Sequence, residues 1–419
     1  MNPTSFPSVL AATSNPSAKV TGTPTSTPTG NLTSNPTSKP LMKPSLPVTY
    51  FPGLLTVEEN GLLLSQGLKS RIIAQSGSKV LYSNGNQSDV PFHFAPDFGA
   101  TFAVPDYAAK NQGGWVYVSN SEVRDEGKGG VGAITFDKDG SVIHYEMLLE
   151  GTTANCAGGK TPWETWVSCE EVADIGHIYQ VDPFGRRSAE KLTLSTQQGG
   201  RYESFTYDDR NKTQPRFYVT EDQPSGPTRR WTPFPESIDW NNPWDMLHGD
   251  GTVEYLVLYE SETNNNIGTY EWVSSFQQAR SNVNYPGSEG IDRRDNVLFI
   301  VTKTDKFLYM IDLDSDTYWR TSTVFGLFDG TPDQIAHLLN GDDEIVYFTE
   351  DGGSDAGIHG RNSLGQFFTI LEAPGWGPET TGLAWDPSRK HMYMALQEDG
   401  VLFDITREDG YPFQGISWV

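Results

Sequence analysis

Basic residues, long apolar runs and cysteines are scarce in this chain, and each shortage excludes something. Lys and Arg number 30 against 54 Asp and Glu, which gives a formal net charge of −24. Such an acidic chain is a poor partner for nucleic acid or for anionic membrane surfaces. No apolar run reaches the roughly 18 residues of a membrane-spanning helix. An anionic substrate would need bound cations or local arginines to approach this protein.

The two cysteines, Cys156 and Cys169, are too few for a disulfide scaffold. They either form one disulfide with each other or leave at least one thiolate to bind a metal ion, and the sequence alone leaves both readings open. The first residues lack the charged and apolar segments of a secretory signal, so export would require a signal outside this chain.

Residues 1–46 differ from the rest because they consist almost entirely of Ser, Thr, Pro, Asn and Gly. Such a segment buries too little apolar surface to offset its ordering entropy, so we expect a disordered linker or stalk before a folded domain over residues 47–419. Asn31, Asn86 and Asn211 each begin an N-glycosylation sequon. Together these features favour a secreted or cell-surface glycoprotein with no transmembrane segment.

What the chain has in abundance is short apolar runs that end in acidic residues. Seven of them recur at intervals of roughly 40 to 50 residues, the length of a β-propeller blade. They span residues 115–122, 165–171, 217–222, 255–260, 298–305, 345–351 and 392–399. If equivalent strands run the same way around a central channel, their acidic ends meet at one mouth, where carboxylates repel one another unless cations bind them. The sequence therefore predicts an all-β propeller with a metal site at its central mouth.

Smaller signals complete the expected architecture. Further apolar runs at residues 307–314 and 401–405 indicate a second strand soon after an acidic strand end. A helix is expected at about residues 332–339, and a helical or irregular insertion over residues 236–247.

The densest block of chemistry-bearing residues spans residues 155–171. It reads Asn-Cys-Ala-Gly-Gly-Lys-Thr-Pro-Trp-Glu-Thr-Trp-Val-Ser-Cys-Glu-Glu. Its glycine pair permits a tight backbone turn, and its end places a cysteine directly before two glutamates. Thiolate favours transition metals, whereas carboxylates suit calcium and ferric iron. The block therefore predicts a mixed-metal site.

This block resembles the PhoX-type alkaline phosphatases, in which Asn-Cys-Ala-Gly-Gly-x-Thr-Pro-Trp-Gly-Thr-Trp is followed by a Cys-Glu-Glu triplet. Weaker matches follow in the family's order, and the resemblance covers most of residues 90–400. These weaker matches lie at residues 200–203, 217–222, 288–290, 331–333 and 378–382.

The resemblance implies a six-bladed β-propeller whose mouth holds ferric iron and calcium ions and hydrolyses phosphomonoesters. It also implies a small phosphoester as substrate, and we expect a monomer. Carried over to this sequence, the expected iron ligands are Cys169, Glu203 and Glu289, and Asn155 is the amide expected to hold phosphate. The expected calcium or bridging ligands are Glu122, Glu170, Glu171, Glu221, Asp222 and Glu379.

The sequence departs from the family pattern at several positions, four of which concern histidine or arginine. Ser121, Tyr202 and Glu398 stand where the family has histidine, and Gly287 stands where it has an arginine. That arginine would clamp a phosphate with two hydrogen bonds, so its loss predicts weak, altered or absent phosphatase activity. The alternatives are a calcium-dependent lactonase or phosphotriesterase-type propeller hydrolase, and a non-catalytic, calcium-stabilised surface module.

Overall fold

The computed structural model describes residues 50–51, 55–105, 111–196, 198–336, 345–353 and 355–413. Short antiparallel strands dominate this part of the chain, as its alternating β-branched and aromatic residues predict. The expected all-β architecture is confirmed. The predicted linker over residues 1–46 lies outside the described residues. Within the described ranges, no helix is long and apolar enough to cross a membrane.

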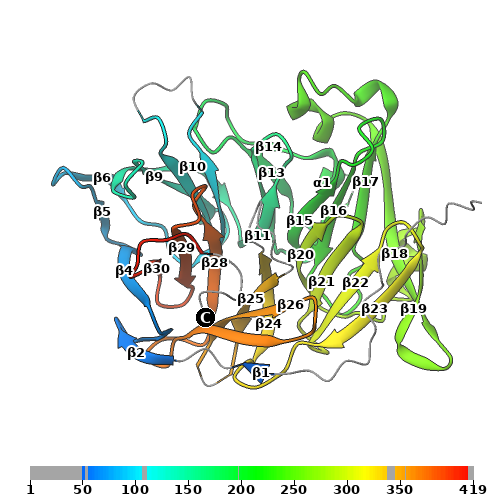
Figure 1. Cartoon of the computed structure of the whole chain (residues 1–419). Coiled ribbons are helices and arrows are strands. Elements are labelled where there is room, and N and C mark those ends of the chain that lie inside the picture. Colours follow the sequence, from blue (N-terminus) through cyan, green and yellow to red (C-terminus); the bar gives the residue numbers. More distant parts are fainter. Residues whose placement is uncertain are drawn as a thin grey trace, which may run out of the picture. The chain divides into compact units, whose positions relative to one another are not determined.

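Two four-stranded sheets are antiparallel meanders in which each strand pairs with the next along the chain (Figure 1). The first contains β7 (Pro96–Ala103), β8 (Trp115–Ser121), β9 (Gly129–Phe136) and β10 (Val142–Thr152). The second contains β11 (Asn155–Lys160), β12 (Trp166–Glu170), β13 (Ile178–Val181) and β14 (Glu190–Lys191).

A nine-stranded sheet combines two further meanders. One contains β15 (Tyr202–Asp208), β16 (Arg216–Glu221), β17 (Arg229–Pro233) and β18 (Gly251–Ser261). The other contains β20 (Ser288–Arg294), β21 (Val297–Thr302), β22 (Phe307–Asp312) and β23 (Thr317–Ser322). The long strand β19 (Asn264–Val273) joins them because it pairs with both β18 and β23.

The remaining sheets use strands from both ends of the chain. One contains β24 (Thr331–Ala336), β25 (Ile345–Asp351), β26 (Gly357–Asn362) and β27 (Phe367–Glu372), extended by β1 (Tyr50–Phe51), β2 (Leu55–Glu59) and β3 (Leu62–Ser65). Another contains β28 (Thr380–Trp385), β29 (His391–Leu396), β30 (Val401–Arg407) and β4 (Leu68–Gln75). Strands β5 (Lys79–Leu81) and β6 (Gln87–Pro91) form a separate pair.

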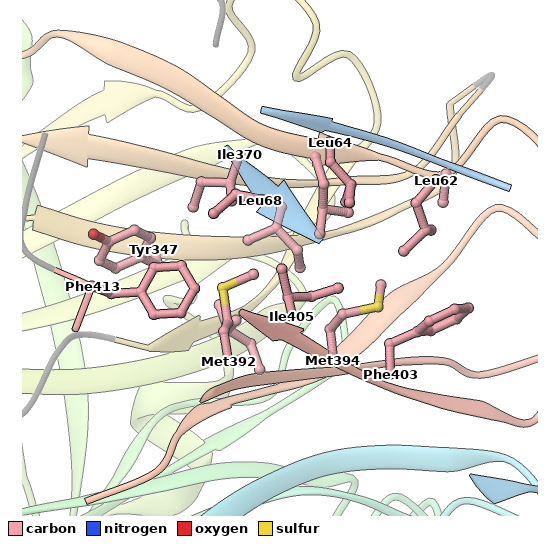
Figure 2. Packing of buried hydrophobic residues seen from close by; sticks show 14 of the residues in the cluster. Leu62, Leu64, Leu68, Tyr347, Ile370, Met392, Met394, Phe403, Ile405 and Phe413 are labelled. Carbon is pink, nitrogen blue, oxygen red and sulfur yellow. The ribbon is translucent and has the colours of Figure 1, made fainter. Parts of the chain in front are cut away.

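The N-terminal strand β4 completes a sheet made otherwise of C-terminal strands. It pairs with β30 from Leu68 opposite Arg407 to Gln75 opposite Val401, and Figure 1 shows the blue strand beside the red one. Figure 2 shows Leu62, Leu64 and Leu68 packed near Met394 and Phe403 from the C-terminal strands. Burying such a side chain contributes roughly 1.5–3 kcal/mol before entropy is subtracted, so this cluster ties the two chain ends together.

The first strands of the meanders lie innermost and close a ring. Strands β7, β11, β15, β20, β24 and β28 contact one another in this order, and β28 contacts β7. A closed circle of radially arranged antiparallel sheets is the arrangement of a β-propeller. The described part of the chain is therefore propeller-like.

Six of the seven acidic-ended runs are equivalent in the fold. They form or overlap the second strands β8, β12, β16, β21, β25 and β29. The seventh run, residues 255–260, lies instead on β18, the fourth strand of its meander. Its exposed Glu260 pairs with Arg320 (Oε1 to Nη2, 3.1 Å) rather than joining the others.

The helical predictions have mixed outcomes. The helix expected at residues 332–339 is wrong over 332–336, because these residues form β24, where Ile335 pairs with Phe348 of β25. Residues 337–339 lie outside the described ranges. The irregular insertion over 236–247 is confirmed. The helices are α1 (Thr193–Thr196), α2 (Phe276–Arg280), and the 3-10 turns η1 (Pro235–Ser237) and η2 (Pro243–Leu247).

Candidate metal centre

A β-bulge near the start of each innermost strand positions one side chain of the site. In five of these strands, the register with the second strand shifts directly after one of the first paired residues. These residues are Pro96, Asn155, Tyr202, Ser288 and Pro332. Bulges re-aim side chains and are common beside functional sites. The residues that follow these five positions form what we call the inner ring: Asp97, Cys156, Glu203, Glu289 and Asp333.

The sixth innermost strand, β28, differs at this point. Its register shifts after Thr381, so the equivalent position is Gly382, which has no side chain to offer. Glu379, which precedes β28 and bridges to Asp351, supplies a carboxylate there instead.

A second set of side chains comes from the ends of the second strands. Each of them directly follows the residue that pairs with the last position before the bulge, as Glu122 follows Ser121, the partner of Pro96, and Asp351 follows Glu350, the partner of Pro332. We call this set the outer ring, and its members are Glu122, Glu171, Asp222, Lys303 and Asp351.

Three groups of these side chains bring ligand atoms within 4.8 Å of one another. The first contains a thiol, and the other two contain only carboxylates. Because Asp97 and Asp333 each belong to two groups, the three groups form one continuous cluster. The groups are Asp97–Glu122–Cys156, Asp97–Asp333–Glu379 and Glu203–Glu289–Asp333.

The cluster fits bound cations. Burial raises the pKa of Asp97 to about 6, although hydrogen bonds to its carboxylate oppose the rise. Burial together with the Asp97 charge raises the pKa of Glu122 to about 9. Burial and the neighbouring carboxylates raise the pKa values of Glu203 and Glu289 well above the usual range. Asp97 Oδ2, Glu203 Oε2 and Glu289 Oε1 are buried without a hydrogen-bond partner. Buried acids of this kind are satisfied by a metal ion.

Cys156 is held in place by the side chain of Asn120. The Asn120 amide donates to the carbonyls of Cys156 (2.9 Å) and Ala157 (2.8 Å) and accepts from Trp166 Nε1 (2.9 Å). The Cys156 thiol lies 3.2 Å from Glu203 Oε1. Burial and nearby carboxylates raise its pKa, so a thiolate at this position calls for a metal ion.

The structure places Cys169 elsewhere than predicted. Side chains alternate along β12, and Cys169 shares a face with Val167 in an apolar cluster that includes Ile178 and Leu192. Its side chain is fully buried there and belongs to none of the three groups. Both cysteines are free, which also excludes a disulfide between them.

Asn155 and Glu170 bond to neighbouring groups outside the three groups of the cluster, Asn155 to two hydroxyls and Glu170 to two backbone N–H groups. The Asn155 amide donates to Ser168 Oγ (3.0 Å) and accepts from Thr152 Oγ1, so both of its polar atoms are occupied. The Glu170 carboxylate accepts from the backbone N–H groups of Thr153 (2.9 Å) and His177 (2.8 Å). Neither residue belongs to the three groups of the cluster.

Glu221 also points away from the cluster. It forms a buried ion pair with Arg229, whose Nη2 lies 2.5 Å from Glu221 Oε1, and it accepts from Gln223 Nε2 (2.8 Å). Of the predicted ligands, the structure brings together Glu122, Glu203, Glu289 and Glu379. Glu171 and Asp222 stand on the outer ring.

Sequence reasoning missed Asp97 and Asp333, and it left the role of Cys156 open. The available signal was the start of each innermost strand, where Asp97-Phe-Gly, Cys156-Ala-Gly and Glu289-Gly recur. The acidic strand ends are more visible in the sequence because they follow the recurrent short apolar runs, whereas the inner-ring acids precede these runs.

Three cations balance part of this negative charge. Arg124 Nη2 lies 2.5 Å from Glu122 Oε1 and 2.7 Å from Glu171 Oε2, and Arg201 Nη1 lies 3.1 Å from Glu171 Oε1. Lys303 Nζ lies 2.9 Å from Asp351 Oδ2. The cationic side chains are 63%, 40% and 37% exposed for Arg124, Arg201 and Lys303, while Glu122 and Glu171 are buried, so positive charge faces the solvent.

Comparison with known proteins agrees with this geometry. Residues 109–284 match the family described as alkaline phosphatase PhoX. The chain is PhoX-like. PhoX of Pseudomonas fluorescens in complex with vanadate, a transition state analogue, is similar in structure, with 14% sequence identity and a TM-score of 0.66. The similarity covers 88% of this chain and 99% of that one, and it confirms the propeller-like fold. The match of residues 109–284 to the family model confirms the resemblance to the PhoX family.

Other solved structures are more distant from the PhoX-like chain. A Bacteroides thetaiotaomicron protein of unknown function is 11% identical, with a TM-score of 0.47 over 81% of this chain and 76% of that one. A gluconolactonase of Xanthomonas campestris is 13% identical, with a TM-score of 0.43 over 81% and 94%. No curated protein matches the chain.

Proposed function

We propose that this protein is an extracellular metal-dependent phosphomonoesterase, built as a six-bladed propeller that binds ferric iron and calcium. The observation that carries the proposal is the convergence of four inner-ring carboxylates and the Cys156 thiol at one mouth of a PhoX-like propeller. Each of the six innermost strands with its meander would count as one blade.

The donor chemistry suggests how the ions are distributed. The group Asp97–Glu122–Cys156 offers a soft thiolate beside carboxylates, which suits ferric iron. The two carboxylate groups, joined through Asp333, suit calcium. Bound ions of this kind supply Lewis-acid charge to a phosphoryl group. Glu171 and Asp222 would complete the set from the outer ring.

The chain's own residues would bring the substrate in and orient it. Arg124, Arg201 and Lys303 present partly exposed cationic groups at the mouth of a protein whose net charge is −24. Local positive charge of this kind attracts an anion and fixes its approach despite the overall repulsion. We infer a small phosphoester as substrate, because these three cations pair with carboxylates of the mouth and leave partly exposed positive charge there.

The location and assembly of the protein belong to the same proposal. The Ser/Thr/Pro-rich residues 1–46 would form a linker, and the sequon residues Asn86 and Asn211 are exposed on the folded part. Both features support a secreted or cell-surface glycoprotein. A monomer fits a propeller whose site lies within one chain.

A second candidate is a non-catalytic, calcium-stabilised surface module. It is favoured by Gly287 in place of the family's arginine and by Tyr202 in place of a histidine. Tyr202 is fully buried and donates to the carbonyl of Gln198 (2.5 Å), so its hydroxyl is not available to a substrate.

The test combines metal analysis with an aryl-phosphate assay on protein purified without chelators. We expect iron and calcium together with turnover that chelation abolishes. The matched variants are Cys156→Ser, which should lose iron and turnover, and Cys169→Ser, which should keep both. Calcium without iron and without turnover would favour the surface module. Turnover of lactones or phosphotriesters with calcium alone would favour a calcium-dependent lactonase or phosphotriesterase-type propeller hydrolase.

A further inference from the structure

Lys303 is the only cation in the outer ring. Four of the five equivalent positions hold carboxylates, at Glu122, Glu171, Asp222 and Asp351. Lys303 is equivalent to these four residues in the fold, because it directly follows Thr302, the partner of Ser288 at the start of β20. A charge reversal at a structurally repeated position calls for a specific explanation.

The Lys303 ammonium lies between carboxylates of two neighbouring sheets. Its Nζ is 2.9 Å from Asp351 Oδ2 on β25 and 3.7 Å from Glu289 Oε1 on β20. The Glu289 side chain is only 2% exposed, and its Oε1 has no hydrogen-bond partner, so Lys303 is the nearby cation that favours the ionised form of this carboxyl. Gly287 lies beside Lys303, since a Cβ at position 287 would be at ordinary van der Waals distance, 3.5 Å, from Lys303 Cβ.

A calcium ion bridging two carboxylates would occupy a comparable place, at about 2.3–2.6 Å from each oxygen. We propose that the Lys303 ammonium takes the place of one divalent cation between Glu289 and Asp351, so that the mouth binds one ion fewer than its carboxylates alone would hold. The inference rests on the metal centre of the proposed function. It concerns this chain's own residue and does not depend on turnover.

Reversing the charge should recreate the missing site. Lys303→Glu would place a third carboxylate beside Glu289 and Asp351, which is a ligand set that a hard cation prefers. Lys303→Gln removes the internal cation without adding a ligand. Lys306→Gln is the matched control, because Lys306 Nζ donates to the backbone carbonyl of Asp329 (2.9 Å) and not to a carboxylate of the mouth.

The experiment is equilibrium dialysis of the full chain against calcium, followed by elemental analysis. We expect Lys303→Glu to bind one more calcium ion per chain than the wild type and Lys306→Gln to match the wild type. A second readout is the calcium-dependent rise in melting temperature, which should be larger in Lys303→Gln than in the wild type.

Three results would overturn the inference, and they are distinguishable. Equal calcium numbers in Lys303→Glu and the wild type would overturn it while leaving the metal centre intact. If Lys303→Glu does not fold, an unchanged calcium-dependent rise in Lys303→Gln would do the same. A wild type that binds no iron and no calcium would remove the metal centre and the inference with it.

Discussion

At the scale of single residues, the candidate site depends on which face of a strand each side chain occupies. Cys156 and Cys169 lie on adjacent strands, yet one faces carboxylates and the other faces Val167 and Ile178. The difference comes from the β-bulge after Asn155, which re-aims the next residue. Sequence spacing alone does not reveal a bulge, so the prediction of Cys169 rests on the resemblance of residues 169–171 to the family's Cys-Glu-Glu triplet.

Gly287 gives a prediction at this scale. Its φ of +66° lies in the left-handed region, and a Cβ there would meet Thr304 Oγ1 at 2.9 Å. Gly287→Ala should therefore lower the free energy of unfolding by about 1–2 kcal/mol from backbone strain, plus the cost of the contact. Denaturant titration measures the change.

Gly127 provides the matched control. Its φ of +71° is similar, but a Cβ there would meet no atom within 4 Å. Gly127→Ala should therefore show the backbone strain alone. If Gly287→Ala costs no more than Gly127→Ala, the contact with Thr304 is not a constraint and an arginine at position 287 would be tolerated.

At the scale of elements, the second strands were predictable and the first strands were not. The runs that became β8, β12, β16, β21, β25 and β29 are apolar, regularly spaced and buried, so their periodicity is visible in the sequence. The run on β18 has the same local pattern, and only the pairing with β19 shows that it is an outer strand. The predicted helix near residue 332 failed because pairing of β24 with β25 outweighed a local helix-start signal.

The pairing of β4 with β30 gives a prediction at the scale of elements. Removing residues 1–46 should leave the melting temperature unchanged, because a segment of Ser, Thr, Pro, Asn and Gly has too little apolar surface to add to the packing. Removing residues 1–76 deletes β4, Leu62, Leu64 and Leu68, and it exposes the edge of β30. The longer truncation should therefore fail to fold or should aggregate.

Circular dichroism and thermal melting of both truncations provide the test. A stable, monomeric protein without residues 1–76 would show that the C-terminal sheet does not need its N-terminal strand. A lower melting temperature without residues 1–46 would show that the segment contributes contacts and is not a linker.

At the scale of the whole molecule, the structure concentrates buried negative charge at one mouth of an already acidic protein. The chain's own cations neutralise only part of it, through Arg124, Arg201 and Lys303. The propeller-like fold and the general location of the candidate metal centre followed from the repeated acidic strand ends. The side chains that line this candidate centre did not, because their placement depends on register shifts that only long-range pairing defines.

Metal removal should make stability depend on pH in a specific direction. In the folded metal-free protein the pKa of Asp97 is raised to about 6 and that of Glu122 to about 9, above their values in the unfolded chain. The folded state then binds more protons than the unfolded state, so stability is highest at low pH within this window and is lost as pH rises. We expect the melting temperature of chelator-treated protein to fall between about pH 5 and pH 9.5.

Metal-loaded protein is the control for this pH dependence. Bound cations would favour the ionised carboxylates, so the melting temperature should vary less over the same range. If the two forms follow the same pH dependence, the carboxylates of the cluster do not bind the metal.

The central claim is that Cys156, together with Asp97 and Glu122, binds iron at the mouth of the propeller. The most direct measurement is an anomalous difference map, collected at the iron absorption edge from crystals of protein purified without chelators. We predict a peak adjacent to Cys156 Sγ among these three side chains. A peak beside Cys169, or no iron peak within the group Asp97–Glu122–Cys156, would contradict the claim.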